Sequence, residues 1–331
     1  MTAHLRQFSG DVPVAAIQMD AKLADLPYNI AQAGDLASKA LERGARIVAL
    51  PEFFTTPIVY DERLFGCSLA PDNPALNMMT SLATRYEAMV GGSYLEMRNG
   101  NVYNTYVLVE PDGTVHRHNK DLPTMVENAF YIGGTDDGHV ETSTGRVGMA
   151  VCWETIRTGT VKRLTGRTDL LMTGSHWWSV PGWSFPKNLW KWAHNYNISL
   201  MERTPALFAS MVGAPSLHAA HCGKISGEML LGAGLSWPTT TQLMAETQII
   251  DGAGRVVARR TVQDGAGIAE AKIRIGAIAP RTATPDRFWI DDLPTIFKLI
   301  WLNQNGANRP AYEKAKKRSL LKAYEFTEKE S

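Results

Sequence analysis

The chain has 331 residues and a formal net charge of +1, and its length allows one large α/β domain or two ordinary ones. Its 34 Lys and Arg against 33 Asp and Glu give no electrostatic case for a nucleic-acid partner, and no apolar run approaches the roughly 20 residues that cross a membrane. The three cysteines lie far apart without metal-ligand spacing, so neither a disulfide framework nor a metal site is predicted. Because the N-terminus is polar and lacks an apolar signal core, the expected location is the cytoplasm.

The N-terminal third of the chain predicts alternating strands and helices. Two apolar runs, 12–19 and 45–50, are typical of buried strands, and the residues between them have the spacing of an amphipathic helix. Asn29 is the expected cap of this helix and Gly44 its end. Such a unit favours a parallel strand pair with a right-handed crossover. The next predicted elements are a helix over 75–86, a strand over 88–95, and a hairpin of strands 104–109 and 115–118 around Pro111-Asp112-Gly113.

The same mixed pattern continues to about residue 279. The predicted elements are a strand over 146–153, a helix over 155–165, a strand over 169–173, a helix over 187–201, a strand over 206–212, a hairpin of 248–250 and 255–259, and a strand over 266–273. Alternation of strands and helices predicts the α/β class. Residues 1–279 are therefore expected to form one domain, followed by a C-terminal extension over residues 280–331.

The extension is too apolar for a free linker. Its apolar residues are Phe288, Trp289, Ile290, Leu293, Ile296, Phe297, Ile300 and Trp301. Side chains of this kind are expected to be buried against something. Two interpretations are open: the extension packs on its own subunit, or it crosses to a partner and stabilises a dimer.

Cys152 is the first candidate for chemistry. It ends an apolar strand and precedes a predicted helix, which places it at the carboxyl edge of a sheet, where open α/β sheets bind ligands. A helix N-terminus next to a cysteine favours the thiolate. The alternative is a buried cysteine that only packs.

Glu52 and Lys120 also follow predicted strands. Glu52 stands between apolar neighbours in Leu50-Pro51-Glu52-Phe53, so its pKa is expected to rise towards the range of a general base. Lys120 follows the hairpin, and a cation there would favour a thiolate and hold a developing oxyanion. Read singly, Glu52 is equally consistent with an exposed turn, and Lys120 is more typical of a solvated surface residue. Three such residues at strand ends nevertheless favour a common site.

These residues lie in segments that resemble the nitrilase superfamily of carbon–nitrogen hydrolases. The matching segments are Pro51-Glu52, His118-Asn119-Lys120, residues 123–127 (PTMVE) and residues 147–154 (VGMAVCWE). The resemblance covers about residues 12–275 and implies a four-layer α-β-β-α sandwich that pairs into homodimers or larger homo-oligomers, with no metal or organic cofactor. It implies that Glu52 is the base, Lys120 the oxyanion stabiliser and Cys152 the nucleophile. Glu127 would be a second, orienting glutamate.

The resemblance implies hydrolysis of small amides or nitriles through a cysteine thioester or thioimidate, with release of ammonia. An acyl transferase using the same thioester, or a silent binding protein on the same fold, are the alternatives. A zinc hydrolase would need a ligand cluster, and His218, His221 and Cys222 come closest, although a polar loop explains them more simply.

The substrate pocket is expected to be aromatic. Thr155 follows Cys-Trp-Glu where true nitrilases usually have Asn, which leaves amide or nitrile open. The expected substrate-binding residues are Trp153, His176 and Trp177, and further aromatic candidates are Trp178, Trp183, Trp190 and Trp192. Such walls favour an apolar acyl group. Arg157 is the opposing candidate, because an arginine in the pocket would bind a carboxylate.

Overall fold

The computed structural model describes residues 10–180, 186–233 and 235–327. The strands are β1 (Asp11–Met19), β2 (Ile47–Ala49), β3 (Met89–Arg98), β4 (Asn101–Val109), β5 (Val115–Asn119), β6 (His139–Thr142), β7 (Gly145–Val151), β8 (Leu170–Ser175), β9 (Ser216–His221), β10 (Lys224–Gly232), β11 (Leu235–Gln242), β12 (Thr247–Ile250), β13 (Val256–Arg260) and β14 (Gly267–Arg274). The helices are α1 (Leu26–Glu42), α2 (Pro74–Tyr86), α3 (Thr158–Leu164), α4 (Lys187–Val212) and α5 (Thr295–Lys317). Short 3-10 turns lie at Glu62–Gly66, Met125–Ala129, Cys152–Ile156 and Val262–Asp264.

Twelve of the strands form one continuous sheet that folds into two facing layers, and β10 and β11 form a separate two-stranded sheet. The order of the larger sheet is β5-β4-β3-β2-β1-β9-β8-β7-β6, and β1 joins the halves through Gln18 and Met19, which pair with Ala220 and His221 of β9. Strands β1, β2 and β3 run parallel in one half, and β7, β8 and β9 run parallel in the other. The carboxyl ends of parallel strands are where α/β proteins bind ligands.

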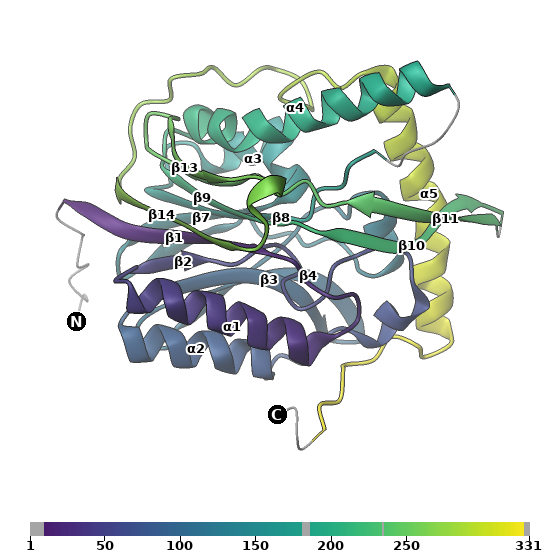
Figure 1. The fold of residues 1–331 in the computed structure, drawn as a ribbon, viewed down its shortest axis with the longest axis horizontal. Helices are drawn as coiled ribbons and strands as arrows, with labels where there is room; N and C mark the ends of the chain where they lie inside the picture. The colour runs from purple at the N-terminus through teal and green to yellow at the C-terminus, as the bar shows by residue number, and fades with distance from the viewer. Residues whose placement is uncertain (1–9, 181–185, 234, 328–331) are drawn as a thin grey trace.

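Successive side chains of each strand point to opposite faces of the sheet. Three layers of buried side chains therefore separate the four layers of helices and strands. In β2, Val48 packs with the apolar face of α1, whereas Ala49 points into the centre. In β8, Met172 points into the same centre, whereas Leu171 packs with Phe208 of α4. Helices α1 and α2 therefore cover one outer face and α3 and α4 the other (Figure 1). This α/β arrangement confirms the predicted four-layer α-β-β-α sandwich.

Helix α1 begins earlier than the sequence pattern predicts. Asp25 caps it by accepting a hydrogen bond from the N–H of Tyr28, and Pro27 stands in its first turn. Asn29, the predicted cap, is buried inside the helix and its amide donates to the backbone carbonyls of Lys22 and Thr55. Asn29 thus does not cap the helix but provides hydrogen bonds to two carbonyls of neighbouring loops.

Helix α4 replaces a predicted helix and strand. It runs unbroken from Lys187 to Val212 with Pro205 inside it, so the predicted strand over 206–212 is wrong. These residues are apolar because Phe208, Ala209 and Val212 pack against β7 and β8. The next segment, expected to be a polar loop around His218 and His221, is instead the buried strand β9. Strands β10 and β11 form a hairpin that the sequence pattern did not predict.

The C-terminal extension packs on its own chain. Helix α5 runs along the edge of the sandwich beside the β10–β11 hairpin (Figure 1), and its Tyr312 joins the core between α1, α2 and the sheet. Phe297 and Trp289 join the central core. Association into homodimers stays a prediction. Among the described residues, no helix is both long and apolar enough to cross a membrane.

Candidate active site

Cys152 lies at a strained turn where β7 ends. Its φ of +51° is in the left-handed region, which costs a non-glycine residue on the order of 1–3 kcal/mol. The chain then forms the 3-10 turn Cys152–Ile156, and an extended Arg157 separates this turn from α3, so the predicted helical stretch over 155–165 is present but its α-helix begins at Thr158. The hydroxyl of Thr155 donates to the carbonyl of Cys152 at 2.6 Å. The strained turn aims the buried thiol towards the carboxyl ends of the strands.

Glu154 holds this turn from behind. Its carboxylate is fully buried and accepts from the N–H of Val151 at 2.7 Å, from His118 Nε2 at 2.9 Å and from Arg163 at 2.7 Å. Burial alone would raise the pKa of Glu154, but the positive charges of His118 and Arg163 hold it well below the usual range. Glu154 is therefore an ionised anchor of the turn that carries Cys152.

Glu52 lies in the segment that follows β2 and is fully buried. Its Oε1 accepts from Lys120 Nζ and from Asn104 Nδ2, both at 2.9 Å, and its Oε2 accepts from the N–H of His176 at 2.8 Å. Burial raises the pKa of Glu52 to about 7 against the lowering effect of Lys120, and the neighbouring charge of Glu127 adds to the rise. The predicted rise of this pKa is confirmed, and it reaches the range suited to a general base near neutral pH.

Lys120 is a buried ammonium between two carboxylates. Its Nζ donates to Glu52 at 2.9 Å and to Glu127 Oε2 at 2.7 Å. Burial works to lower the pKa of Lys120, but Glu127 and Glu52 outweigh it and the pKa is raised. Glu127, on the 3-10 turn Met125–Ala129, also accepts from the N–H of Thr124 at 2.8 Å and from the hydroxyl of Tyr131.

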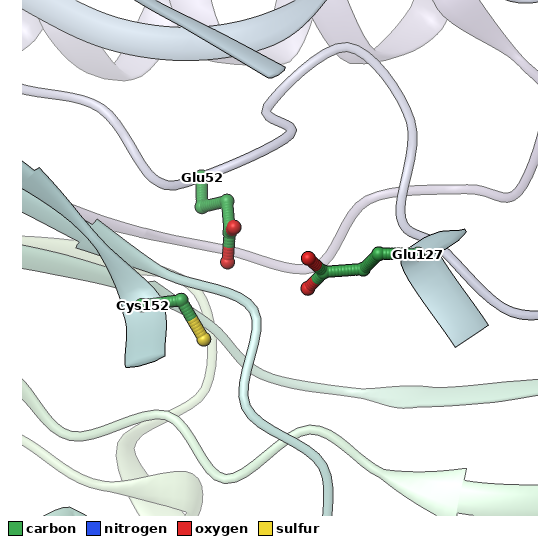
Figure 2. Close-up of side chains that lie close together, drawn as sticks. All are labelled: Glu52, Glu127 and Cys152. Atoms are coloured by element: carbon green, nitrogen blue, oxygen red, sulfur yellow. The ribbon is translucent and has the colours of Figure 1, made fainter. Parts of the chain in front are cut away.

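Three side chains converge on one point. Figure 2 shows the carboxylates of Glu52 and Glu127 and the thiol of Cys152 pointing towards one another, and one ligand atom of each lies within 4.8 Å of the others. This spacing alone would suit a metal ion. The ammonium of Lys120 already bonds to both carboxylates and would repel a cation, so the residues do not fit a resident metal.

The thiol of Cys152 is neutral at rest. Burial raises its pKa well above the usual value, the charge of Glu52 raises it further, and Lys120 opposes both. The expected effect of the cation is present, because Lys120 favours the thiolate, but burial and the charge of Glu52 outweigh it. A proton acceptor is needed at the moment of reaction, and Glu52 lies beside the thiol.

A cavity opens above Cys152 and Glu127. Its empty space amounts to about 840 Å³, which includes the open solvent at its mouth. Its described lining residues are Ile58, Thr124, Met125, Val126, Glu127, Cys152, Trp153, His176, Trp177, Trp178, Ser179, Val180, Asn197, Met229, Phe297, Ile300 and Gln304. Of the predicted substrate-binding residues, Trp153, His176 and Trp177 are at this cavity.

Arg157 is not at the cavity. Its guanidinium bonds to Asp121 and to the carbonyl of Trp153, and the residue is 5 % exposed. Trp190 and Trp192 lie on α4 outside the lining, and Trp192 is largely exposed. Trp183 lies outside the described residues.

Several residues of the site were not found from the sequence. Asn104 bonds to Glu52, which is 52 residues away in sequence, and Tyr131 bonds to Glu127, which it follows by four residues. His221, considered above only as a zinc ligand, donates from Nε2 to the backbone carbonyl of Glu52 at 2.8 Å. Burial lowers the pKa of His221 to about 4, which keeps it a neutral donor. Within the part of the chain that is described, His218, His221 and Cys222 do not gather as metal ligands.

His176 links the cavity to the backbone around Glu52. The N–H of Ile58 and the indole N–H of Trp178 each point at one nitrogen of its ring. A neutral imidazole has one acceptor nitrogen, so one of these bonds forms at a time. Gly174, two residues earlier, is required for close packing, because a Cβ there would lie 2.7 Å from the backbone nitrogen of Glu52.

Comparisons with known proteins agree with this geometry. The family model "Carbon-nitrogen hydrolase" matches residues 13–281. An aliphatic nitrilase of Rhodococcus rhodochrous is 24 % identical over 306 residues, covering 84 % of this chain and 80 % of that protein. A cyanide hydratase of Gibberella baccata is 28 % identical over 157 residues, covering 42 % of this chain and only 44 % of that protein.

Solved structures show the same fold. A double mutant of the amidase from Nesterenkonia sp. AN1, in complex with acrylamide, superposes with a TM-score of 0.62 at 15 % identity, covering 88 % of this chain and 98 % of that one. Nit3 of Saccharomyces cerevisiae superposes with a TM-score of 0.58 at 17 % identity, covering 80 % and 90 % of the two chains. With a family match over most of its length and this shared fold, the chain belongs to the carbon–nitrogen hydrolase family and is an enzyme of that family.

Proposed function

We propose that this enzyme hydrolyses small amides or nitriles through a covalent intermediate on Cys152. The observation that carries the proposal is a buried Glu52, with its pKa raised to about 7, beside a thiol that is neutral at rest. A base that is partly deprotonated near neutral pH is suited to take the proton of such a thiol. Nitrilases and amidases among its relatives support the choice of substrates.

In the first step, Glu52 takes the thiol proton while Cys152 Sγ bonds to the amide carbonyl carbon. The electron pair of the C=O bond moves to the oxygen. Lys120 uses two N–H groups on the glutamates, which leaves the third for this oxygen, and the backbone N–H of Trp153 is the second donor.

In the second step, the protonated Glu52 gives its proton to the departing nitrogen, the C–N bond breaks, and a thioester remains. Glu52 then removes a proton from water as the water attacks the thioester carbon; the C–S bond breaks, the acid leaves, and Glu52 returns the proton to the sulfur of Cys152. A nitrile would form a thioimidate, and one additional water would convert it to the thioester with loss of ammonia. Glu127 holds Lys120 through its Oε2, which also accepts from Thr124 and Tyr131, and we assign the first proton transfer to Glu52 because its pKa is raised to about 7.

The experiment that tests the proposal measures ammonia release across a panel of amides and nitriles, together with intact-protein mass spectrometry during turnover. An acyl adduct should appear on the peptide that contains Cys152, and Cys152→Ala should lose both the adduct and turnover. Full activity in Cys152→Ala would contradict the proposal.

The cavity favours a neutral, apolar acyl group. Most of its wall is apolar, and no Arg or Lys is among its described lining residues. A substrate carboxylate would lose its hydration without gaining a cation, which costs several kcal/mol. A neutral arylaliphatic amide or nitrile should therefore exceed a carboxylate-bearing analogue of similar length in kcat/KM by about tenfold or more, roughly 1.4 kcal/mol. The reverse preference, abolished in Arg157→Ala, would show that Arg157 reaches the substrate after all.

A further inference from the structure

We propose that helix α5 completes the active site: Ile300 and Phe297 form the wall that limits the acyl group, and Asn305 positions the turn that carries Glu127. The helix lies beyond residues 13–281, the part of the chain that the family model matches. The inference rests on the hydrolase function proposed above.

Helix α5 presents one face to the cavity and another to solvent. Phe297 is 6 % exposed and Ile300 half-buried, and both line the cavity that holds Cys152. Leu299 and Leu302, on the other face, are 60 % and 59 % exposed. Side chains on the inner face therefore define how much space an acyl group has.

Asn305 lies on the same helix and bonds to the Glu127 turn. Its Oδ1 accepts from the backbone N–H of Met125 at 2.8 Å and from Asn128 Nδ2 at 3.0 Å. Met125 has a φ of +53°, a conformation that a non-glycine residue keeps only when its surroundings enforce it. The two donors flank Glu127, so Asn305 fixes the turn on both sides of the carboxylate that holds Lys120.

The helix itself is anchored firmly enough to act as a reference for the turn. Gln304 donates from Nε2 to the carbonyl of Leu230 on β10 at 2.9 Å. Further along, the hydroxyl of Tyr312 accepts from the N–H of Val102 on β4 at 3.3 Å. Contacts on both sides of Asn305 thus tie α5 to the hairpin and to the main sheet.

The wall is tested by a matched pair of neighbouring truncations, Ile300→Ala and Leu299→Ala. We expect Ile300→Ala to raise the ratio of kcat/KM for a branched or bicyclic acyl amide over a short acyl amide by roughly tenfold, because pocket volume discriminates at about this level. Leu299→Ala should leave the ratio within twofold. If the ratio stays within twofold in both variants, or changes equally in both, Ile300 does not bound the substrate and the wall assignment is overturned.

The positioning role is tested by Asn305→Leu and Asn305→Asp, which have similar shape but differ in whether they accept hydrogen bonds. Misplacing a catalytic group by about 1 Å can cost on the order of 100-fold, so we expect Asn305→Leu to lower kcat at least tenfold with KM within threefold. Asn305→Asp should recover kcat to within threefold of the parent enzyme. Two results contradict the role: kcat within threefold of the parent in Asn305→Leu, or equal loss of kcat and of thermal stability in both variants.

These outcomes separate the inference from the proposed function. If the parent enzyme releases ammonia and Cys152→Ala does not, while Ile300→Ala and Asn305→Leu both behave like Leu299→Ala, the hydrolase proposal stands and the inference fails. If the parent enzyme forms no adduct on Cys152 with any amide or nitrile, the hydrolase proposal itself fails.

Discussion

Two fully buried glutamates, Glu52 and Glu154, stand a few residues beyond strand ends and differ sharply in their acidity. Glu52 has its pKa raised to about 7, mainly by burial, whereas cations that outweigh burial hold the pKa of Glu154 well below its usual range. Both accept hydrogen bonds from a cation and from a backbone N–H. Burial therefore does not decide which carboxylate is reactive.

The ratio of cations to carboxylates explains the difference. At the catalytic site, Lys120 serves both Glu52 and Glu127, so one positive charge faces two carboxylates. Behind the turn that carries Cys152, Glu154 pairs with His118 and Arg163, which also pair with Asp136 and Asp121; with Arg157, which pairs with Asp121, three cations face three carboxylates. A shortage of positive charge makes the first carboxylate a base, and a sufficient supply makes the second an anchor.

The largest expected effect is on turnover, in Glu52→Gln. Loss of a general base should lower kcat by about 100-fold to 10⁴-fold, because Gln cannot accept the thiol proton. Stability should stay equal or rise, since the change removes a poorly compensated buried charge. Steady-state kinetics and urea unfolding check both points. A loss of stability as large as that of Glu154→Gln would contradict the comparison.

The next effect is on stability, in Glu154→Gln. Removing one partner of a buried charge network costs on the order of 3–5 kcal/mol of unfolding free energy. Urea unfolding of this variant is compared with Glu141→Gln, which removes a carboxylate that is 65 % exposed and should change stability by less than about 0.5 kcal/mol. If the two variants unfold alike, Glu154 is not the anchor described.

Glu127→Gln should have an intermediate effect on turnover. The variant should fold and keep Cys152 open to alkylation, but lose turnover by about tenfold to 100-fold, because Lys120 loses one of its two anchors. The charge of Glu127 contributes to the raised pKa of Glu52, so the acidic limb of activity should also move to lower pH. If this variant matches Glu52→Gln in every kinetic and pH measurement, the division of roles is wrong.

A smaller effect concerns the pH dependence of stability. The carboxylates of Glu154 and Asp136 raise the pKa of His118 from 6.5 to about 9 against the opposing effect of burial. Its contribution is complete below pH 6.5 and is lost as the pH rises through 9, whereas that of Glu154 is present above pH 4.5 and lost as the pH falls. Thermal unfolding temperatures should therefore decline from pH 6.5 to 9, and His118→Gln should flatten this decline. An equally steep decline in the variant would exclude His118 as its source.

Much of the fold could be predicted from sequence because its central strands are buried on both faces. Strands β1, β7 and β8 are apolar runs for this reason. The same rule failed at 206–212, where an apolar run belongs to a buried helix, since composition does not distinguish the two. Strands β10 and β11 escaped prediction because much of their surface is exposed.

The site was predictable to the extent that its residues follow strands. Glu52 and Cys152 stand at carboxyl ends that the parallel order brings together. Asn104 and Asn305 act through hydrogen bonds between distant segments, and these depend on the packing of whole elements. The resting protonation of Cys152 depends on the same packing, because full burial and the charge of Glu52 outweigh the local effect of Lys120.

The central claim, that Glu52 takes the proton of a thiol that is neutral at rest, is tested most directly by the pH dependence of iodoacetamide alkylation at each cysteine, followed by peptide-resolved mass spectrometry. Cys67 and Cys222 are internal references, because burial raises their pKa values to about 12 and about 11. Alkylation of Cys152 should be the fastest and should rise through a midpoint near pH 7, and in Glu52→Gln that midpoint should disappear. A midpoint near pH 7 that persists in Glu52→Gln, or a Cys152 rate that only follows those of Cys67 and Cys222, would contradict the account.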